Sequence, residues 1–265
     1  MDLIQAVFLG VLQGLTEWLP VSSSAHLALA QIFLGLTVPI AFDLALHLGT
    51  LLAVFAYFRR DIVQIAQGFF SFSWKNPGFR TSALIVVAMV PTAIIGFAFK
   101  GFFEAMFSSA AQIGIALIIT GTILFIASKA TSKGREVGVK ESVVIGLAQG
   151  IAVAPGISRS GSTISAALLL SVPAEKAARF SFLLGIPAIL GASAIEIAGQ
   201  HAELSAVPLP PLFAGIAAAA LVGYWSIGFL LGVLKKANLR WFAYYCWALG
   251  LVAVAASVFI LGTGL

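Results

Sequence analysis

The chain has 265 residues, of which 60% are apolar and only 9% are charged. A soluble domain carries about 25% charged residues, so this composition excludes a water-soluble globule and also intrinsic disorder. The net charge is +5, but the basic residues are scattered among long apolar runs, which argues against a nucleic-acid-binding face. The single cysteine excludes an internal disulfide framework.

Eight apolar regions follow one another along the chain, and two of them are broken near their middles by polar and helix-breaking residues. About 20 apolar residues are enough to cross a bilayer as a helix, so the unbroken regions predict six full transmembrane helices. The sequence thus predicts an all-α polytopic membrane protein, a single integral membrane domain over residues 1–265. In chain order the regions are 3–33 (broken), 41–58, 81–99, 111–128, 143–172 (broken), 178–198, 212–234 and 241–263.

The basic residues predict the orientation of these spans. Eleven of the 15 Lys and Arg residues lie in three connecting segments, 59–80, 129–140 and 235–240, which the positive-inside rule places on the cytoplasmic side. The last two segments share a side only if region 143–172 crosses an even number of times. Its two arms are about nine residues each, about half of the hydrocarbon thickness. We therefore expect both broken regions to be re-entrant helical hairpins, whose tips line a protein-covered site.

The two halves of the chain, approximately 1–135 and 136–265, resemble each other. The segment GVLQGLTE at 10–17 aligns with GLAQGIAV at 146–153, and each half reads as one broken hairpin followed by three spans. A hairpin returns to its own side and three spans are an odd number of crossings, so the second half begins on the opposite side of the membrane and is inverted relative to the first. Inverted repeats with broken helices place their functional site near the membrane midplane, between the two breaks.

The first break reads QGLTEWLPVSSSAH. Glu17 is an ionisable residue inside the bilayer, which marks a functional site by default, although a hydrogen-bonded carboxyl that holds helices together is the alternative. Gln13 lies four residues earlier, on the same helical face, where both side-chain oxygens can approach a divalent cation. Three serines follow the break, and for any single one of them the favoured role is to cap the new half-helix. They are Ser22, Ser23 and Ser24. His26 lies within one turn of them and is either structural or a base, acid or metal ligand.

The second break reads PGISRSGST, from Pro155 to Thr163. Its glycines, hydroxyls and following helix N-terminus predict an anion-binding nest. Arg159 carries the side chain best shaped for bidentate phosphate contact; the alternative is that it only neutralises Glu17 or Glu196. A phosphate cradle that faces a carboxylate, hydroxyls and an imidazole within a membrane predicts phosphoryl transfer on a lipid phosphate or diphosphate.

These two motifs, at this separation in a chain of this length, resemble the undecaprenyl-diphosphate phosphatases, the bacitracin-resistance family of bacterial inner membranes. A third segment, FDLALHLGT at 42–50, is also similar to that family. The resemblance implies hydrolysis of undecaprenyl diphosphate to undecaprenyl phosphate and inorganic phosphate, with Mg²⁺ or Ca²⁺. This reaction recycles the carrier lipid for peptidoglycan synthesis and confers bacitracin resistance.

The resemblance also implies roles for individual residues. Glu17 is the essential carboxylate, Ser23 the proposed nucleophile, His26 a nearby histidine of disputed role, and Arg159 the phosphate-binding arginine. The metal is expected at Gln13 and Glu17. The family pattern allows either Glu or Gln at position 13. Because this chain has the neutral amide of Gln13 there, Glu17 carries the only negative charge. The remaining residues of the two motifs are expected to bind substrate: Ser22, Ser24, Gly156, Ser158, Ser160, Gly161, Ser162 and Thr163.

Several alternatives stay open at the level of sequence. The nucleophile is Ser23, His26 or a metal-bound water, and we favour Ser23. A lipid-phosphate transporter or flippase with the same cradle is the main rival function, because inverted repeats with broken helices are typical of transporters. The assembly is also open, with a homodimer as one candidate.

Two further expectations concern residues outside the motifs. Asp43 and His47 lie four residues apart, and pairing between them is favoured over an extension of the site. The aromatic residues near the C-terminus are expected to anchor the protein at the membrane interface. They are Trp225, Trp241, Tyr244, Tyr245 and Trp247.

Overall fold

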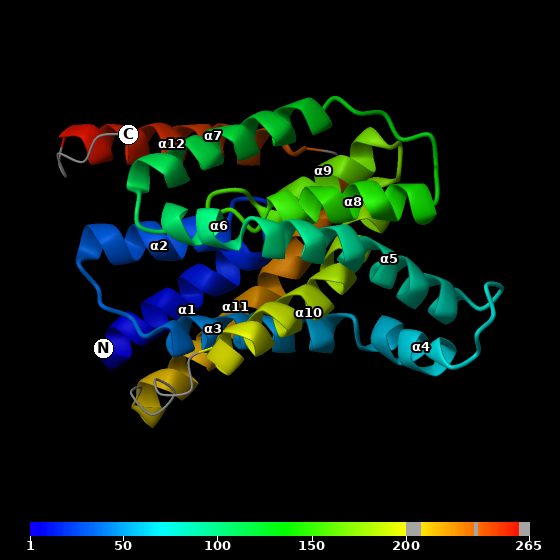
Figure 1. The fold of residues 1–265 in the computed structure, drawn as a ribbon, viewed down its shortest axis with the longest axis horizontal. Helices are drawn as coiled ribbons and strands as arrows, with labels where there is room; N and C mark the ends of the chain where they lie inside the picture. The colour runs from blue at the N-terminus through cyan, green and yellow to red at the C-terminus, as the bar shows by residue number, and fades with distance from the viewer. Residues whose placement is uncertain (200–207, 236–237, 260–265) are drawn as a thin grey trace.

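The computed structural model describes residues 1–199, 208–235 and 238–259, and throughout these residues the regular structure is helical (Figure 1). This confirms the predicted all-α class. The helices are α1 (Leu3–Trp18), α2 (Ser23–Leu34), α3 (Ile40–Tyr57), α4 (Arg59–Phe69), α5 (Pro77–Ala98), α6 (Lys100–Met106), α7 (Ala110–Ala127), α8 (Val139–Ile151), α9 (Arg159–Leu169), α10 (Ala174–Gly199), α11 (Leu209–Lys235) and α12 (Arg240–Phe259).

Six of these helices, α3, α5, α7, α10, α11 and α12, are long and apolar enough to cross a membrane. They coincide with the six predicted spans apart from a few terminal residues, and residues 260–263 of the last span lie outside the described residues. The agreement reflects the physics of the bilayer, since a run of apolar residues can satisfy its backbone in lipid only by forming a helix.

One predicted connecting segment contains a helix that the sequence analysis missed. Residues 59–80 form α4 and the start of α5, and these two helices pack closely together. Ile62 and Ile65 of α4 face the core, whereas Arg59 and Arg60 are exposed. The helix is too short and too charged to register as a span, so only its amphipathic pattern could have revealed it.

The two broken regions each form a pair of short helices that enter the fold from opposite ends. In Figure 1, α1 runs from the N-terminus toward the middle of the molecule and α2 returns, while α8 and α9 do the same from the other end. The helices of the second pair have only 13 and 11 residues, which is too short to cross a bilayer. The placement of these hairpins within a membrane stays a prediction.

The packing of the two halves is reciprocal, because α1 packs on α11 and α8 packs on α5. Glycines aligned by the internal repeat make both contacts close. A Cβ added to Gly10 would collide with the backbone oxygen of Gly215, and one added to its repeat partner Gly146 would collide with the backbone oxygen of Ala88. Small residues at such positions let helix backbones approach. This exchange of partners is compatible with an inverted repeat, which stays a prediction.

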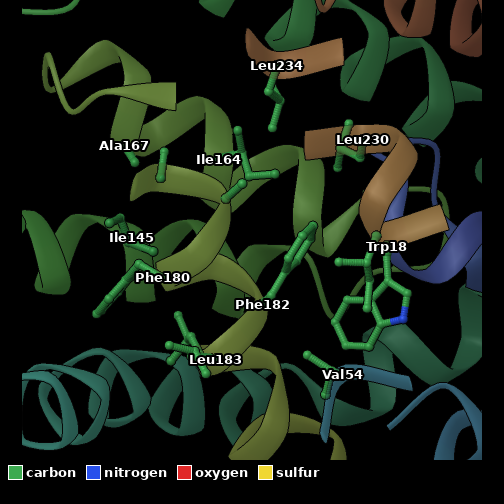
Figure 2. Packing of buried hydrophobic residues seen from close by; sticks show 14 of the residues in the cluster. Trp18, Val54, Ile145, Ile164, Ala167, Phe180, Phe182, Leu183, Leu230 and Leu234 are labelled. Carbon is green, nitrogen blue, oxygen red and sulfur yellow. The ribbon is translucent and has the colours of Figure 1, made fainter. Parts of the chain in front are cut away.

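The main hydrophobic core lies beside the break that ends α1. Trp18, the last residue of α1, is fully buried and meets Phe182 of α10 edge to face at 5.3 Å between ring centroids. Figure 2 shows these two rings side by side, with Ile164 of α9 and Leu230 of α11 among the surrounding side chains. Helices α9, α10 and α11 of the second half therefore pack around the end of α1, and they hold the residue before Trp18 in place.

Candidate active site

Glu17 is the residue before Trp18, and its carboxylate contacts Arg159 at the centre of the fold. Arg159 is the first residue of α9, so the two breaks contribute one partner each. The Arg159 Nη2 atom donates to Glu17 Oε1 at 2.6 Å. The Glu17 side chain is 6% exposed and that of Arg159 is 15% exposed. A charge pair removed from water to this degree is costly unless both partners are well bonded.

Residues of α10 and α1 hold the Arg159 guanidinium. Its Nη1 donates to the backbone oxygen of Ser181 at 3.4 Å, and its Cζ lies 5.0 Å from the centroid of the Trp18 ring, within cation–π distance. On the α10 side it lies against Gly185, where an added Cβ would come within 2.8 Å of Cζ. The guanidinium thus occupies the space that a side chain at position 185 would fill.

The second oxygen of Glu17 accepts hydrogen bonds from two residues named by the sequence analysis. Ser23 Oγ donates to Glu17 Oε2 at 2.7 Å, and Gln13 Nε2 donates to the same oxygen at 3.0 Å. Ser23 is the first residue of α2, and its hydroxyl reaches back across the break. Ser22 before it takes a positive φ of 69°, a strained conformation that clusters at functional sites.

His26 lies apart from this cluster. Its Nδ1 lies 2.8 Å from the backbone oxygen of Ser22, and its Nε2 lies 2.7 Å from the hydroxyl of Tyr245. A carbonyl only accepts, so Nδ1 carries the proton and Nε2 of the neutral ring accepts from Tyr245. The two rings also stack, with 5.7 Å between centroids and an interplanar angle of 3°. Both nitrogens are engaged, and neither is directed at Ser23 or Glu17.

His47 is instead the histidine that faces Glu17. Its Nε2 lies 3.7 Å from Glu17 Oε2, and its Nδ1 donates to the backbone oxygen of Asp43 at 2.8 Å. The Asp43 carboxylate accepts from Gln31, at 2.9 and 3.1 Å. The favoured expectation of pairing between Asp43 and His47 is thus met through the backbone oxygen of Asp43 and not through its carboxylate, and His47 faces Glu17 as well. The backbone carbonyl one turn earlier satisfies the imidazole, which frees its other nitrogen to extend the site.

The other serines of the first break bond locally. Ser22 caps α2 by accepting a hydrogen bond from the backbone nitrogen of Ala25 at 3.4 Å, which confirms the expected capping role for this serine. Its hydroxyl also lies 3.2 Å from that of Ser24. Ser22 and Ser24 thus stabilise the start of α2, and Ser23 is the serine of this break that bonds Glu17.

Among the hydroxyls of the second break, that of Ser160 joins the two tips together. Ser158 caps α9 by accepting from the backbone nitrogen of Gly161 at 3.0 Å, and Ser160 donates to the backbone oxygen of Leu19 in the first break at 3.0 Å. Thr163 Oγ1 lies 2.6 Å from Ser181 Oγ, beneath Arg159. In the region of the predicted nest, these hydroxyls therefore form hydrogen bonds within the protein, around Arg159. The Oγ of Ser162 is buried without a hydrogen-bond partner.

Gly156 is the position at which the second break requires glycine. Its φ is +97°, a conformation that residues with a side chain rarely adopt, and an added Cβ would lie 2.5 Å from Ala116 Cβ. Its carbonyl accepts from Thr120 of α7 at 2.8 Å. Gly156 thus shapes the turn that delivers Arg159. Gly161 leaves room for the capping residue Ser158, whose Cβ would lie 2.9 Å from a Cβ at position 161.

Comparison with known proteins assigns the chain to a family. It matches the family model described as bacitracin resistance protein BacA over residues 6–252. The chain belongs to the BacA family. An undecaprenyl-diphosphatase of Carboxydothermus hydrogenoformans is 46% identical over 98% of this chain and 100% of its own length. Relatives with the same name in Syntrophotalea carbinolica and Methanobrevibacter smithii are 44% and 40% identical, over 94% and 97% of this chain.

This BacA family member brings together four of the residues named from sequence, Gln13, Glu17, Ser23 and Arg159. The sequence analysis missed the residues that position them, because no local pattern marks a contact made across the fold. Ser181 and Gly185 lie on an otherwise ordinary span, and Tyr245 was assigned to interfacial anchoring. Only His47 carried a signal, the four-residue spacing from Asp43.

Proposed function

We propose that this chain hydrolyses undecaprenyl diphosphate to undecaprenyl phosphate and inorganic phosphate in the bacterial inner membrane. Membership of the BacA family and the names of its relatives support the reaction. The observation that best supports this reaction is that one carboxylate contacts two residues: Glu17 accepts a hydrogen bond from Ser23 on one oxygen and pairs with Arg159 on the other. A base, a nucleophile and a phosphate-binding cation thus lie within one buried cluster.

In the first step, Ser23 Oγ attacks the terminal phosphorus of the diphosphate. Its proton passes to Glu17 Oε2, which already lies 2.7 Å away. The Oγ–P bond forms as the bond between phosphorus and the bridging oxygen breaks, and undecaprenyl phosphate leaves with that oxygen. The hydrogen bonds of both His26 nitrogens, to Ser22 and Tyr245, favour Ser23 over His26 as the nucleophile.

In the second step, water attacks the phosphorus of the phosphoserine as the bond between Ser23 Oγ and phosphorus breaks, and inorganic phosphate leaves with the water oxygen and both of its protons, as H₂PO₄⁻. Glu17 returns its proton to Ser23 Oγ, which restores the resting hydroxyl. Arg159 stabilises the charge that develops on the phosphoryl oxygens in both steps. Its two observed bonds use two of the five guanidinium N–H donors, so the others are available to substrate.

The same proposal includes a divalent cation, Mg²⁺ or Ca²⁺, held by Glu17 and Gln13. Both ions prefer oxygen ligands, and Mg²⁺ is commonly bound through one or two carboxylates together with substrate phosphates. The Oε1 atom of Gln13 is buried without a hydrogen-bond partner, so it fits the role of a ligand. Such an ion supplies positive charge that neutralises the diphosphate.

A transporter or flippase is the second candidate, because the reciprocal packing of the two halves is also the architecture of many transporters. Transport needs the cationic cradle of Arg159 but not a serine bonded to the carboxylate. We also retain a homodimer as a proposed assembly, which analytical ultracentrifugation in detergent tests directly.

The deciding experiment measures phosphate release from a prenyl diphosphate by the purified protein in detergent, with and without a chelator. We expect metal-dependent release that is abolished by Glu17→Gln and by Arg159→Ala. The controls are Lys100→Ala and Glu104→Gln, because these residues form an exposed ion pair, 3.4 Å apart, on α6. Absence of release from folded wild-type protein with every metal tried would favour the transporter, and release unaffected by both site variants would reject the site.

A further inference from the structure

A hollow whose lining includes no residue of the Glu17 cluster lies where the last turns of α11 meet the end of α3 and the start of α4. This cavity of about 690 Å³ is lined in part by two glycines of α11, Gly228 and Gly232. A Cβ added to Gly232 would meet nothing within 4 Å, and one added to Gly228 would only touch the ring of Tyr57 at 3.6 Å. The missing side chains open one face of α11, beside the Tyr57 and Tyr224 rings, which lie 5.2 Å apart.

The rim of this groove is basic. Four cations and two carboxylates line it, an excess of two positive charges. Arg179 pairs with Asp61, but Arg59, Arg60 and Lys235 are exposed and take part in no ion pair within the part of the chain that the structure describes. The basic rim comes from segments 59–80 and 235–240, which the positive-inside rule assigns to the cytoplasmic side.

We propose that this groove binds an anionic phospholipid, with an acyl chain along the glycine face of α11 and the headgroup phosphate among Arg59, Arg60 and Lys235. Basic pockets between transmembrane helices on the cytoplasmic side attract anionic headgroups. An apolar floor that continues into a cationic rim complements an amphiphile, whereas a free anion would use the rim alone. The inference is independent of the proposed hydrolysis, because none of these residues contacts the Glu17 cluster.

The test compares lipid retention by the full-length protein, using native mass spectrometry after addition of equal amounts of phosphatidylglycerol and phosphatidylcholine with matched acyl chains. Wild-type protein should retain the anionic lipid preferentially. The triple change Arg59→Gln, Arg60→Gln and Lys235→Gln should lower that preference by about tenfold or more, because each basic side chain near an anionic surface contributes roughly fivefold. Its matched control removes three exposed cations outside the groove: Lys129→Gln, Lys133→Gln and Lys140→Gln.

A second variant separates the floor of the groove from its charge. Gly232→Phe should fill the groove and lower retention of phosphatidylglycerol while every cation stays in place. Equal loss in the control triple variant would reduce the effect to net charge and overturn the proposal, as would full retention by Gly232→Phe. Displacement of the lipid by excess inorganic phosphate would overturn it as well, since the rim would then be a site for a free anion.

Discussion

Glu17 and Arg159 lie 142 residues apart in the chain, yet Glu17 Oε1 and Arg159 Nη2 are 2.6 Å apart. This ion pair joins a residue of the first broken hairpin to a residue of the second. Removing one partner of a buried pair leaves the other charge uncompensated, which costs several kcal/mol. The pair can persist when substrate binds, because the guanidinium N–H donors that do not bond Glu17 or Ser181 are available to a phosphate.

Replacement of Arg159 by lysine tests whether guanidinium geometry matters beyond charge. Lysine keeps the positive charge but cannot bridge Glu17, the Ser181 carbonyl and a phosphate at once. We expect kcat/KM for a prenyl diphosphate to fall about a hundredfold, the scale for loss of one preorganised donor. A lysine variant with wild-type kinetics would show that a point charge suffices.

Ser23→Ala tests the nucleophile. Without Oγ there is no phosphoserine, and phosphate release should fall by at least about a thousandfold. Ser108→Ala is the matched control, because that exposed hydroxyl only donates to the backbone of Ala105. Rapid quench with ³²P-labelled substrate should trap a labelled wild-type protein, and an alanine variant with nearly full activity would assign the attack to water instead.

Tyr245→Phe tests the role of His26. The change removes the hydrogen bond to Nε2 and keeps the stacked ring. We expect a loss of about 1 kcal/mol in unfolding free energy, seen as a lower Tm in detergent, with activity within severalfold of wild type. Tyr244→Phe, a neighbouring exposed tyrosine, should change neither quantity. Inactivation as deep as that of Ser23→Ala would instead place His26 in the chemistry.

Gly146→Ala tests the close approach of α8 to α5. The new methyl group would collide with the carbonyl oxygen of Ala88, so the helices must separate and the Tm should fall. Gly191→Ala in α10 is the control, because a Cβ there meets nothing within 4 Å and alanine suits a helix better than glycine. Similar Tm values for both variants would mean that the α5 backbone yields without cost.

Gln13→Glu tests the proposed metal ligands. A second carboxylate one turn before Glu17 raises the negative charge of the site, and ligand charge tunes the affinity for hard cations. The Mg²⁺ concentration that gives half-maximal phosphate release should fall by about tenfold. A titration that shows no shift, or a shift to higher concentration, would place the ion elsewhere.

Much of this molecule was predictable because bilayers impose local rules. The spans, the two breaks and the close-packed glycines at positions 10 and 146 follow from runs of residue types that can be read without any partner. The sequence also predicted that the cradle of Arg159 faces Glu17, whereas their direct ion pair was only the alternative to phosphate binding. Helix α4 was missed because its pattern is amphipathic rather than apolar.

The sequence by itself determined the six long apolar helices, their order and the residue types of the site, since apolar length and ionisable residues act locally. Only the tertiary structure decided which side chains meet. It turned His26 toward Tyr245 and brought His47 to Glu17, and it placed Gly185 against Arg159. These outcomes depend on side-chain directions that neighbours from distant helices impose, and hydrogen-bond partners more than 200 residues away, such as Tyr245 for His26, leave no trace in the local pattern.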